Sequence, residues 1–435
     1  MTCGGPISPS ALGTCSSASS RCVLPFEGVL FNHSECAAAG AVGDSLEMGN
    51  LSAVHERPLS YLSNLYVTQA DAAAELREAK ENGMTLVVDT SHWDMTALVK
   101  DAPAIAELSR RDGLPIVIAV PPPKAGSESD EETAIAQLDV ALRVRLAEGV
   151  DMCAGVIGPL HVRLPNKTSR LTQEEEWQLT VAAKASRRVG GAPILVVIDH
   201  ESCQCHPQGT PPLDPYYEHM WTTVWEAQKK DGEGEGNPQP RVAVVNPCRH
   251  RDDLSGAKLL LRKGCCVGLT CSGYDYSVVE QRWPGKAPLR SPDDALRVME
   301  RLVTDADSRE DAAGRLMVST GVMMRMHLKK YGGCGYGFAP ALLRRQVPQR
   351  YSECHEMIDR MTFCNAVDFL AYPWTPPPAA EVSVQTFLCH WCRGAYPDTQ
   401  VKYEKLGFTY CSMPCLSSHR KVHFDPFVTG LSIAS

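Results

Sequence analysis

Eight short apolar runs between residues 29 and 319 constrain the fold of this chain more than any other feature. Most of them are rich in β-branched residues and do not alternate with polar residues, which is typical of strands that are buried on both faces. Such strands are found mainly in parallel sheets, because helices then cover both faces. The runs lie at residues 29–31, 85–89, 114–120, 153–157, 194–198, 242–245, 266–269 and 316–319.

Segments with helical periodicity separate these runs. Thr68 with Asp71, and Thr172 with Glu175, have the spacing of capping boxes at helix N-termini. Helices are expected at residues 72–81, 133–148, 173–189 and 293–303. Strands that alternate with helices predict an α/β fold, either a (β/α)8 TIM-like barrel or an open doubly wound sheet. The eight runs favour the barrel.

The composition is that of an ordinary globular protein. The 435 residues are 44% hydrophobic and 22% charged, with a formal net charge of −8. An acidic chain of this kind has no electrostatic footprint for nucleic acid or for an anionic membrane, so neither is expected as a partner. The start of the chain lacks the pattern of a signal peptide, and the eighteen cysteines show no disulfide framework. We expect free thiols and a cytoplasmic or nuclear location.

Prolines and low-complexity segments predict the domain boundaries. Three consecutive prolines, Pro376 to Pro378, interrupt any helix or central strand. The stretch 204–241 is expected to be an insertion or long loop after the fifth strand, because it is rich in proline, glycine and glutamate. The expected organisation is a disordered tail at 1–20, a barrel at 21–373, a proline-rich linker at 374–384, a zinc finger at 385–425 and a tail at 426–435.

Cysteine and histidine residues gather after the linker with metal-ligand spacing. Two cysteines are separated by two residues, a second pair follows, and two histidines come after it at intervals of four. Zinc needs four such ligands, and a CxxC turn supplies two of them from one short segment. We expect one zinc ion held by the four cysteines, with the two histidines as substitutes or remnants. The residues are Cys389, Cys392, Cys411, Cys415, His419 and His423.

The run YCSMPCLSSHRK at 410–421 resembles the second half of HIT and MYND zinc fingers. The resemblance is partial, because residues 393–410 contain no further cysteine pair. Fingers of that kind usually bind proteins, so the resemblance implies a protein partner. A closed site of four thiolates also has no open coordination position for catalysis.

Three motifs in the main domain resemble the phosphotriesterase-related branch of the amidohydrolase superfamily. They are LMVSTG at 316–321, YGGCGY at 331–336 and CNAVDFL at 364–370, in the order in which the family has them. Segments 83–90 and 155–158 are also similar to its second and fourth strands. The resemblance implies a barrel with two metal ions at its C-terminal mouth, which produce hydroxide and polarise the scissile group.

This sequence departs from the family at its metal ligands. An ungapped alignment gives Asn32 and Ser34 for the first-strand histidine pair, and Pro159, Asn246 and Gly321 for the fourth-, sixth- and eighth-strand ligands. The fifth-strand position is Val197 or, with a shift, Asp199 or His200. Proline and glycine offer no side-chain ligand, and asparagine is a poor replacement for imidazole. The resemblance therefore implies a degenerate centre.

Two hypotheses on the main domain remain open at this point. His33, Glu35, Asp199 and His200 could form a remnant pocket, because His33 and Glu35 are two apart and would share one face of a strand. The leading hypothesis is a non-catalytic protein-binding or scaffold module, a pseudoenzyme with zinc only in its finger. The alternative is an active metal-dependent hydrolase of small amides, esters or phosphoesters with a rearranged site. A small-molecule ligand in the barrel mouth is a further candidate partner.

Overall fold

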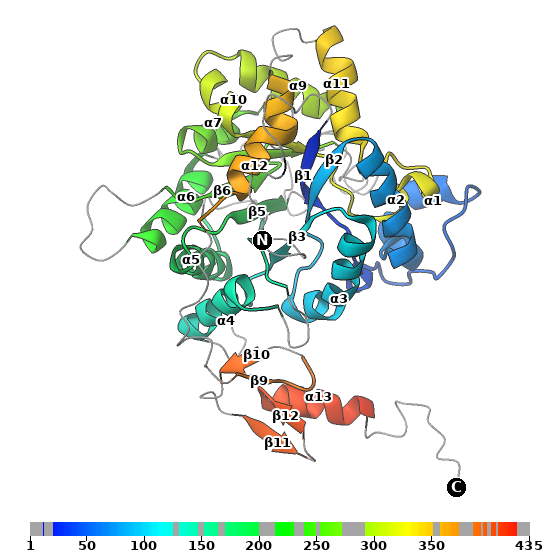
Figure 1. Cartoon of the computed structure of the whole chain (residues 1–435), viewed down its shortest axis with the longest axis vertical. Helices are drawn as coiled ribbons and strands as arrows, with labels where there is room; N and C mark the ends of the chain where they lie inside the picture. Colours follow the sequence, from blue (N-terminus) through cyan, green and yellow to red (C-terminus); the bar gives the residue numbers. More distant parts are fainter. Residues whose placement is uncertain are drawn as a thin grey trace.

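The chain folds into a barrel of parallel strands, followed by a small separate module (Figure 1). The computed structural model describes residues 12, 21–124, 130–146, 152–163, 170–199, 214–229, 239–248, 253–271, 292–350, 357–373, 386–392, 395–397, 402–405 and 408–423. Eight strands pair in sequence order. They are β1 (Cys22–Glu27), β2 (Met84–Asp89), β3 (Ile116–Val120), β4 (Val156–Arg163), β5 (Ile194–Asp199), β6 (Val242–Val245), β7 (Cys266–Thr270) and β8 (Leu316–Ser319).

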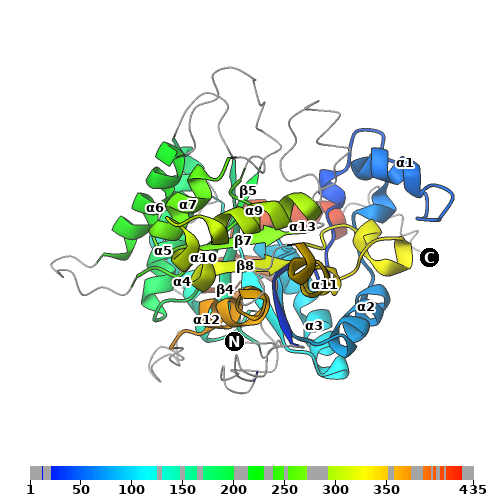
Figure 2. The ribbon, with the colours of Figure 1, turned by 90° about the horizontal axis from the view of Figure 1, so that it is seen from above.

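Helices surround the strands, as the view from above shows (Figure 2). The described helices of this domain are α1 (Leu51–Glu56), α2 (Gln69–Glu81), α3 (Met95–Asp112), α4 (Glu131–Arg143), α5 (Gln173–Arg188), α6 (Asp214–Gln228), α7 (Ser255–Arg262), α9 (Pro292–Thr304), α10 (Arg309–Arg315), α11 (Phe338–Arg350) and α12 (Asn365–Leu370). This arrangement confirms the expected (β/α)8 TIM-like barrel and excludes the open doubly wound sheet.

Alternate strand residues form two hydrophobic layers. Leu86 and Val88 belong to a cluster inside the barrel, whereas Val87 between them packs in the larger cluster under the helices. Both layers are apolar, which explains why the strands read as continuous apolar runs. Phe363 and Phe369 extend the inner cluster from a π-helical turn (η9, Arg360–Cys364) and from α12. These two elements therefore close one end of the barrel.

Several predicted segments are confirmed and several are wrong. The helices expected at 72–81, 173–189 and 293–303 are α2, α5 and α9, and Thr172 with Glu175 forms a complete capping box. The expected first strand at 29–31 is wrong, because β1 ends at Glu27 and these residues follow it. The stretch 204–241 is not a continuous loop, because it contains the helix α6. The helix α3 was not predicted.

The expectation of free thiols is wrong for Cys364, which is disulfide-bonded.

Three of the predicted segments fall largely outside the described residues. They are the linker at 374–384, the tail at 426–435 and most of the tail at 1–20. In the part of the chain that the structure describes, no helix combines the length and the apolar character needed to cross a bilayer.

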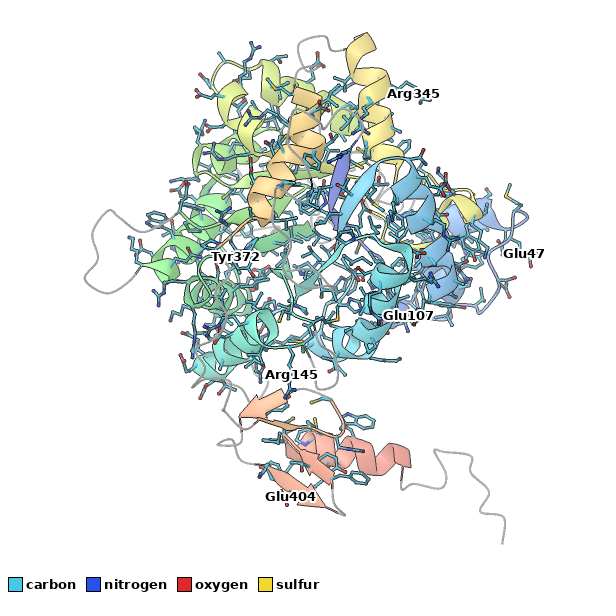
Figure 3. The ribbon with its side chains drawn as sticks, viewed as in Figure 1. Glu47, Glu107, Arg145, Arg345, Tyr372 and Glu404 are labelled. Atoms are coloured by element: carbon cyan, nitrogen blue, oxygen red, sulfur yellow. The ribbon has the colours of Figure 1, made fainter. Side chains whose placement is uncertain are left out.

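The C-terminal module consists of two short hairpins and one helix. β9 (Thr386–Leu388) pairs with β10 (Ala395–Pro397), β11 (Tyr403–Lys405) pairs with β12 (Phe408–Tyr410), and α13 (Met413–His423) follows. Its small apolar cluster includes Phe387, Tyr410 and two cysteines. Figure 3 shows Glu404 of β11 at the outer side of this module and Glu47 at the edge of the segment near α1. So small a cluster needs additional stabilisation, which a metal ion would supply.

Candidate metal centre and barrel mouth

Four cysteines of the C-terminal module converge on one point. Cys389 follows β9, Cys411 follows β12, and Cys415 lies in the first turn of α13. The sulfur atoms of these residues and of Cys392 all lie within 4.8 Å of one another. The Sγ atom of Cys411 is 3.6 Å from those of Cys392 and Cys415. The hairpin ends and the helix start thus place four thiols in a cluster, as the spacing predicted.

The dimensions of the cluster fit a tetrahedral zinc ion. Zinc binds thiolate sulfur at about 2.3 Å, so two ligands of one ion lie about 3.8 Å apart. Hydrogen bonds among Cys389, Cys392 and Cys411 lower the pKa of the first and raise that of the third, so these thiols titrate as one group. The Tyr396 hydroxyl is 3.3 Å from the Cys392 sulfur. The described residues contain no second group of three or more cysteine, histidine or acidic side chains arranged this closely.

The two histidines of the predicted finger lie on α13. Their positions, 419 and 423, belong to the described helix, but their side chains lie outside the description. Their role as substitute ligands therefore stays a prediction. Four thiols meet without them.

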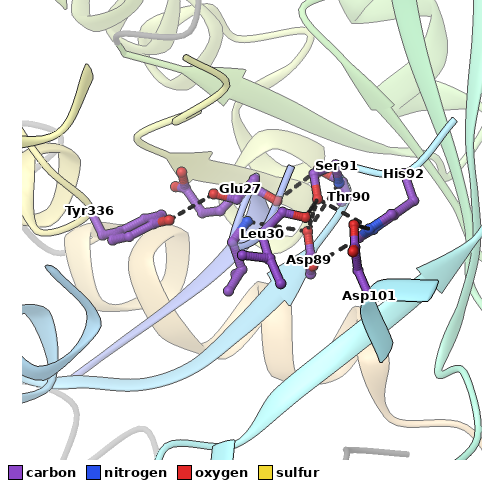
Figure 4. Close-up of polar contacts among 10 residues, drawn as sticks. Glu27, Leu30, Asp89, Thr90, Ser91, His92, Asp101 and Tyr336 are labelled. Atoms are coloured by element: carbon purple, nitrogen blue, oxygen red, sulfur yellow. Dashed lines mark hydrogen bonds and ion pairs between the residues drawn. The ribbon is translucent and has the colours of Figure 1, made fainter. Parts of the chain in front are cut away.

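Glu27, the last residue of β1, is the buried carboxylate of the barrel mouth (Figure 4). It is fully buried and accepts hydrogen bonds from the Ser319 hydroxyl at 2.6 Å and from the Thr320 and Val322 amides at 2.7 Å each. The Gly321 amide donates to both carboxylate oxygens, at 3.0 and 3.1 Å. Burial raises the pKa of Glu27 to about 7, against these hydrogen bonds, which lower it. The carboxylate thereby joins β1 to the end of β8.

The placement of Asn32 and Ser34 at a strand end is wrong. β1 ends five residues before Asn32, and Ser34 begins a short 3-10 helix (η3, Ser34–Cys36). Their side chains bond to each other, with 2.5 Å between Ser34 Oγ and Asn32 Oδ1. The residues two apart at the end of β1 are instead Phe26, which packs inside the barrel, and Gly28. The sequence pattern did not identify Phe26 and Gly28 as strand-end residues, because the charged Glu27 between them interrupts the apolar run.

The predicted remnant pocket is wrong for His33 and Glu35. These residues do not share the face of a strand, because His33 precedes η3 and Glu35 lies within it. Glu35 is exposed, whereas His33 is buried between aromatic rings. The Asp199 backbone ends β5, but its side chain and all of His200 lie outside the described residues. The predicted pocket is therefore contradicted at His33 and Glu35, and its other two positions lie outside the described side chains.

The other three positions that align with metal ligands have structural roles. Pro159 lies within β4 and follows a cis peptide bond. The Asn246 amide exchanges hydrogen bonds with Thr270 of β7, at 2.8 and 3.0 Å. Gly321 has a φ of 80°, a conformation that favours glycine, and its amide donates to Glu27. Pro159 and Gly321 have no side-chain group that could bind a transition metal. The side chain of Asn246 is already bonded to Thr270.

A serine, a histidine and two aspartates lie near the end of β2: Asp89 is its last residue, Ser91 and His92 follow it, and Asp101 belongs to α3 (Figure 4). Ser91 Oγ lies 3.3 Å from His92 Nδ1, and His92 Nε2 lies 3.2 Å from an Asp101 oxygen. The Ser91 hydroxyl already donates to Asp89, at 2.5 Å, and the residue is 3% exposed. Burial lowers the pKa of His92, but Asp101 and Asp89 raise it more, so the net shift is upward. Ser91 therefore belongs to a buried hydrogen-bond network and is not an accessible nucleophile.

No family model and no curated protein matches this chain. Solved structures do match. The resiniferatoxin-binding protein of Rhodobacter sphaeroides is 18% identical with a TM-score of 0.65, and the match covers 86% of this chain and 96% of that one. The phosphotriesterase homology protein of Escherichia coli is 15% identical, with a TM-score of 0.55 and coverage of 81% and 99%. A mutant of a Deinococcus radiodurans phosphotriesterase-like lactonase is 15% identical, with a TM-score of 0.53 and coverage of 85% and 99%. The main domain therefore has the barrel fold of phosphotriesterase-like proteins.

Proposed function

We propose that this protein is a binding or scaffold module in which the phosphotriesterase-like barrel has lost metal-dependent hydrolysis and the C-terminal module binds one zinc ion. The observation that carries the proposal is the use of the barrel mouth. Glu27 accepts hydrogen bonds from the backbone after β8, and Asn246 is bonded to Thr270. A catalytic metal needs ligand atoms that are held in place and still available.

A barrel of this kind can serve binding without a catalytic centre, because fold and function are separable. One matched structure is named a resiniferatoxin-binding protein, which supports a ligand-binding role for this fold. The C-terminal module is proposed to bind a protein partner. A cluster of four cysteines with sulfur atoms 3.6 Å apart supports a closed structural zinc site, which stabilises a small recognition surface.

Metal analysis of the purified full-length chain tests the proposal. We expect about one zinc ion per chain in the wild type and strong loss of zinc in Cys411→Ser, because Cys411 lies at the centre of the cluster. Cys334→Ser is the matched control, because Cys334 is an exposed cysteine outside the cluster. Stoichiometric metal that survives replacement of all four cysteines by serine would place a metal in the barrel and contradict the proposal.

The alternative function is hydrolysis of small amides, esters or phosphoesters by a rearranged barrel site. Its test uses the same two variants with aryl esters, lactones and phosphotriesters as substrates. Turnover that requires added metal and survives in Cys411→Ser supports the hydrolase. Absence of turnover in a wild-type protein that holds one zinc ion supports the scaffold. A partner that binds the wild type and Cys334→Ser, but not Cys411→Ser, supports recognition through the zinc module.

A further inference from the structure

The loops after β1 and β2 are held together by one buried carboxylate. Asp89 Oδ1 accepts hydrogen bonds from the Val29 amide at 3.2 Å and from the Ser91 amide at 3.0 Å. The Ser91 hydroxyl also lies 3.1 Å from the Leu30 carbonyl (Figure 4). Because Asp89 is fully buried, these bonds are shielded from water. The network fixes the positions of the residues that follow in both loops.

Those following residues form an aromatic stack at the barrel mouth. The His33 ring lies parallel to Phe31, with centroids 5.1 Å apart, and to Trp93, with centroids 4.4 Å apart. His161 of β4 meets Trp93 edge to face, at 5.2 Å and an interplanar angle of 68°. Three loops or strands that are distant in sequence therefore contribute rings to one cluster.

Two polar atoms of this cluster are buried without a hydrogen-bond partner among the described residues. They are His33 Nε2 and Trp93 Nε1. His33 is only 6% exposed, so water does not reach its ring freely. A buried polar atom without a partner costs about 1–3 kcal/mol, and native proteins rarely leave one in place without a use. Since the two rings are stacked, one small molecule could serve both atoms.

The chemistry of these atoms selects the ligand. The indole nitrogen of Trp93 is a donor only, so its partner must be an acceptor. Burial and the nearby His92 and His161 lower the pKa of His33 to about 4, so this ring is neutral at pH 7. The carboxylates of Asp89 and Asp101 face His92 on the same side of the barrel. The two carboxylates outnumber the one histidine that they face, so the local charge disfavours an anion. The flat rings favour a planar molecule.

We infer that His33, Trp93 and His161 form a binding subsite for a small, planar, uncharged molecule that carries a hydrogen-bond acceptor, such as an aromatic amide. Trp93 donates to the acceptor, His33 provides the second polar contact, and His161 supplies an aromatic wall. This subsite uses none of the four cysteines. The zinc count that tests the proposed function and the titration that tests the subsite can therefore fail independently.

The experiment titrates benzamide into the full-length protein labelled with nitrogen-15 and follows the indole signals of its seven tryptophans. Trp93→Phe assigns the Trp93 signal and removes the donor while it keeps an aromatic ring. His33→Phe removes the other nitrogen atom in the same way. Trp225→Phe is the matched control, because Trp225 belongs to a stacked tryptophan pair on α6. The signals of benzamide itself report the affinity of each variant.

We expect millimolar benzamide to shift the Trp93 signal. Loss of one hydrogen bond, about 1 kcal/mol, weakens binding about fivefold in Trp93→Phe and in His33→Phe, with no change in Trp225→Phe. Benzoate tests the charge, and cyclohexanecarboxamide tests planarity, so each should bind at least about fivefold more weakly. A Trp93 signal that does not move, which leaves water as the occupant, overturns the inference. So does equal affinity for benzoate, or binding that neither variant weakens.

Discussion

Replacement of Glu27 with alanine tests how the barrel is closed. The described pairings run from β1 to β8 and include no backbone ladder between β8 and β1. The Glu27 carboxylate joins them instead, with bonds from the Ser319 hydroxyl and from the amides of residues 320–322. In Glu27→Ala these donors lose their acceptor. The two strand ends then share the bond from the Gly28 amide to the Val322 carbonyl, at 2.7 Å, and the bond from the Phe26 amide to the Ser319 hydroxyl, at 3.2 Å.

The magnitude follows from the number of donors that lose their acceptor. Three buried amides lose their partner, and each such loss costs about 1–3 kcal/mol, less where water enters the space that the side chain vacates. The Ser319 hydroxyl can rotate to another acceptor. We therefore expect Glu27→Ala to lower the free energy of unfolding by about 3–5 kcal/mol. The amides of residues 320–322 should also exchange hydrogen much faster.

Urea unfolding followed by circular dichroism, together with hydrogen exchange at residues 320–322, provides the measurement. Glu35→Ala is the matched control, because Glu35 is an exposed glutamate that lies a few residues further along the chain. Its replacement should change the free energy of unfolding by no more than about 0.5 kcal/mol. If Glu27→Ala also stays within about 1 kcal/mol of the wild type, the carboxylate does not close the barrel and the reasoning is refuted.

Three further substitutions probe the barrel, each by urea unfolding. Gly268→Ala places a Cβ atom 2.3 Å from the Phe26 ring and should cost about 1–3 kcal/mol, with partial recovery when Phe26→Leu is added; no cost would contradict the packing. Asp71→Asn leaves Arg325 without its carboxylate at 2.8 Å and should cost about 2–3 kcal/mol near pH 7. Hydrogen bonds outweigh burial and lower the pKa of Asp71, so this cost should fade as the pH falls below about 4. Burial lowers the pKa of His327 from 6.5 to about 4, so the stability of the wild type falls as the pH drops through that range. His327→Gln should remove up to about 3 kcal/mol of this fall. Identical pH profiles of stability for the two proteins would refute the prediction.

The apolar-run pattern predicted seven of the eight strands approximately and misplaced the first. The reason is physical. β1 contains Pro25 and ends in Glu27, and both residues break an apolar run, yet every residue of the strand is buried. Glu27 is tolerated there because backbone amides almost 300 residues away satisfy it, and no local pattern encodes such a contact. The apolar residues 29–31, to which the pattern assigns the strand, lie in a buried loop.

The two candidate sites differ in how far a local sequence pattern predicts them. The cysteine cluster was predictable, because its ligands lie within 27 positions of one another and their spacing alone restricts how the segment folds. The aromatic stack was not predictable, because it depends on the hydrogen bonds of Asp89 that align two loops. Its rings are those of His33, Trp93 and His161. A local signal existed only for Asp89, as a polar residue at the end of an apolar run.

The state of the barrel mouth bears directly on the question of catalysis. At the end of β1, Phe26 fills the interior against Gly268 and Glu27 is bonded to the backbone after β8. At the end of β8, Gly321 has a φ of 80° and points its amide at that carboxylate. An aspartate placed at position 321 would be strained in this conformation and would face an acidic neighbour. Single substitutions toward a metal ligand would therefore meet a structure that already uses the same space and the same hydrogen bonds. This interdependence favours a barrel devoted to binding over a hydrolase with one ligand exchanged.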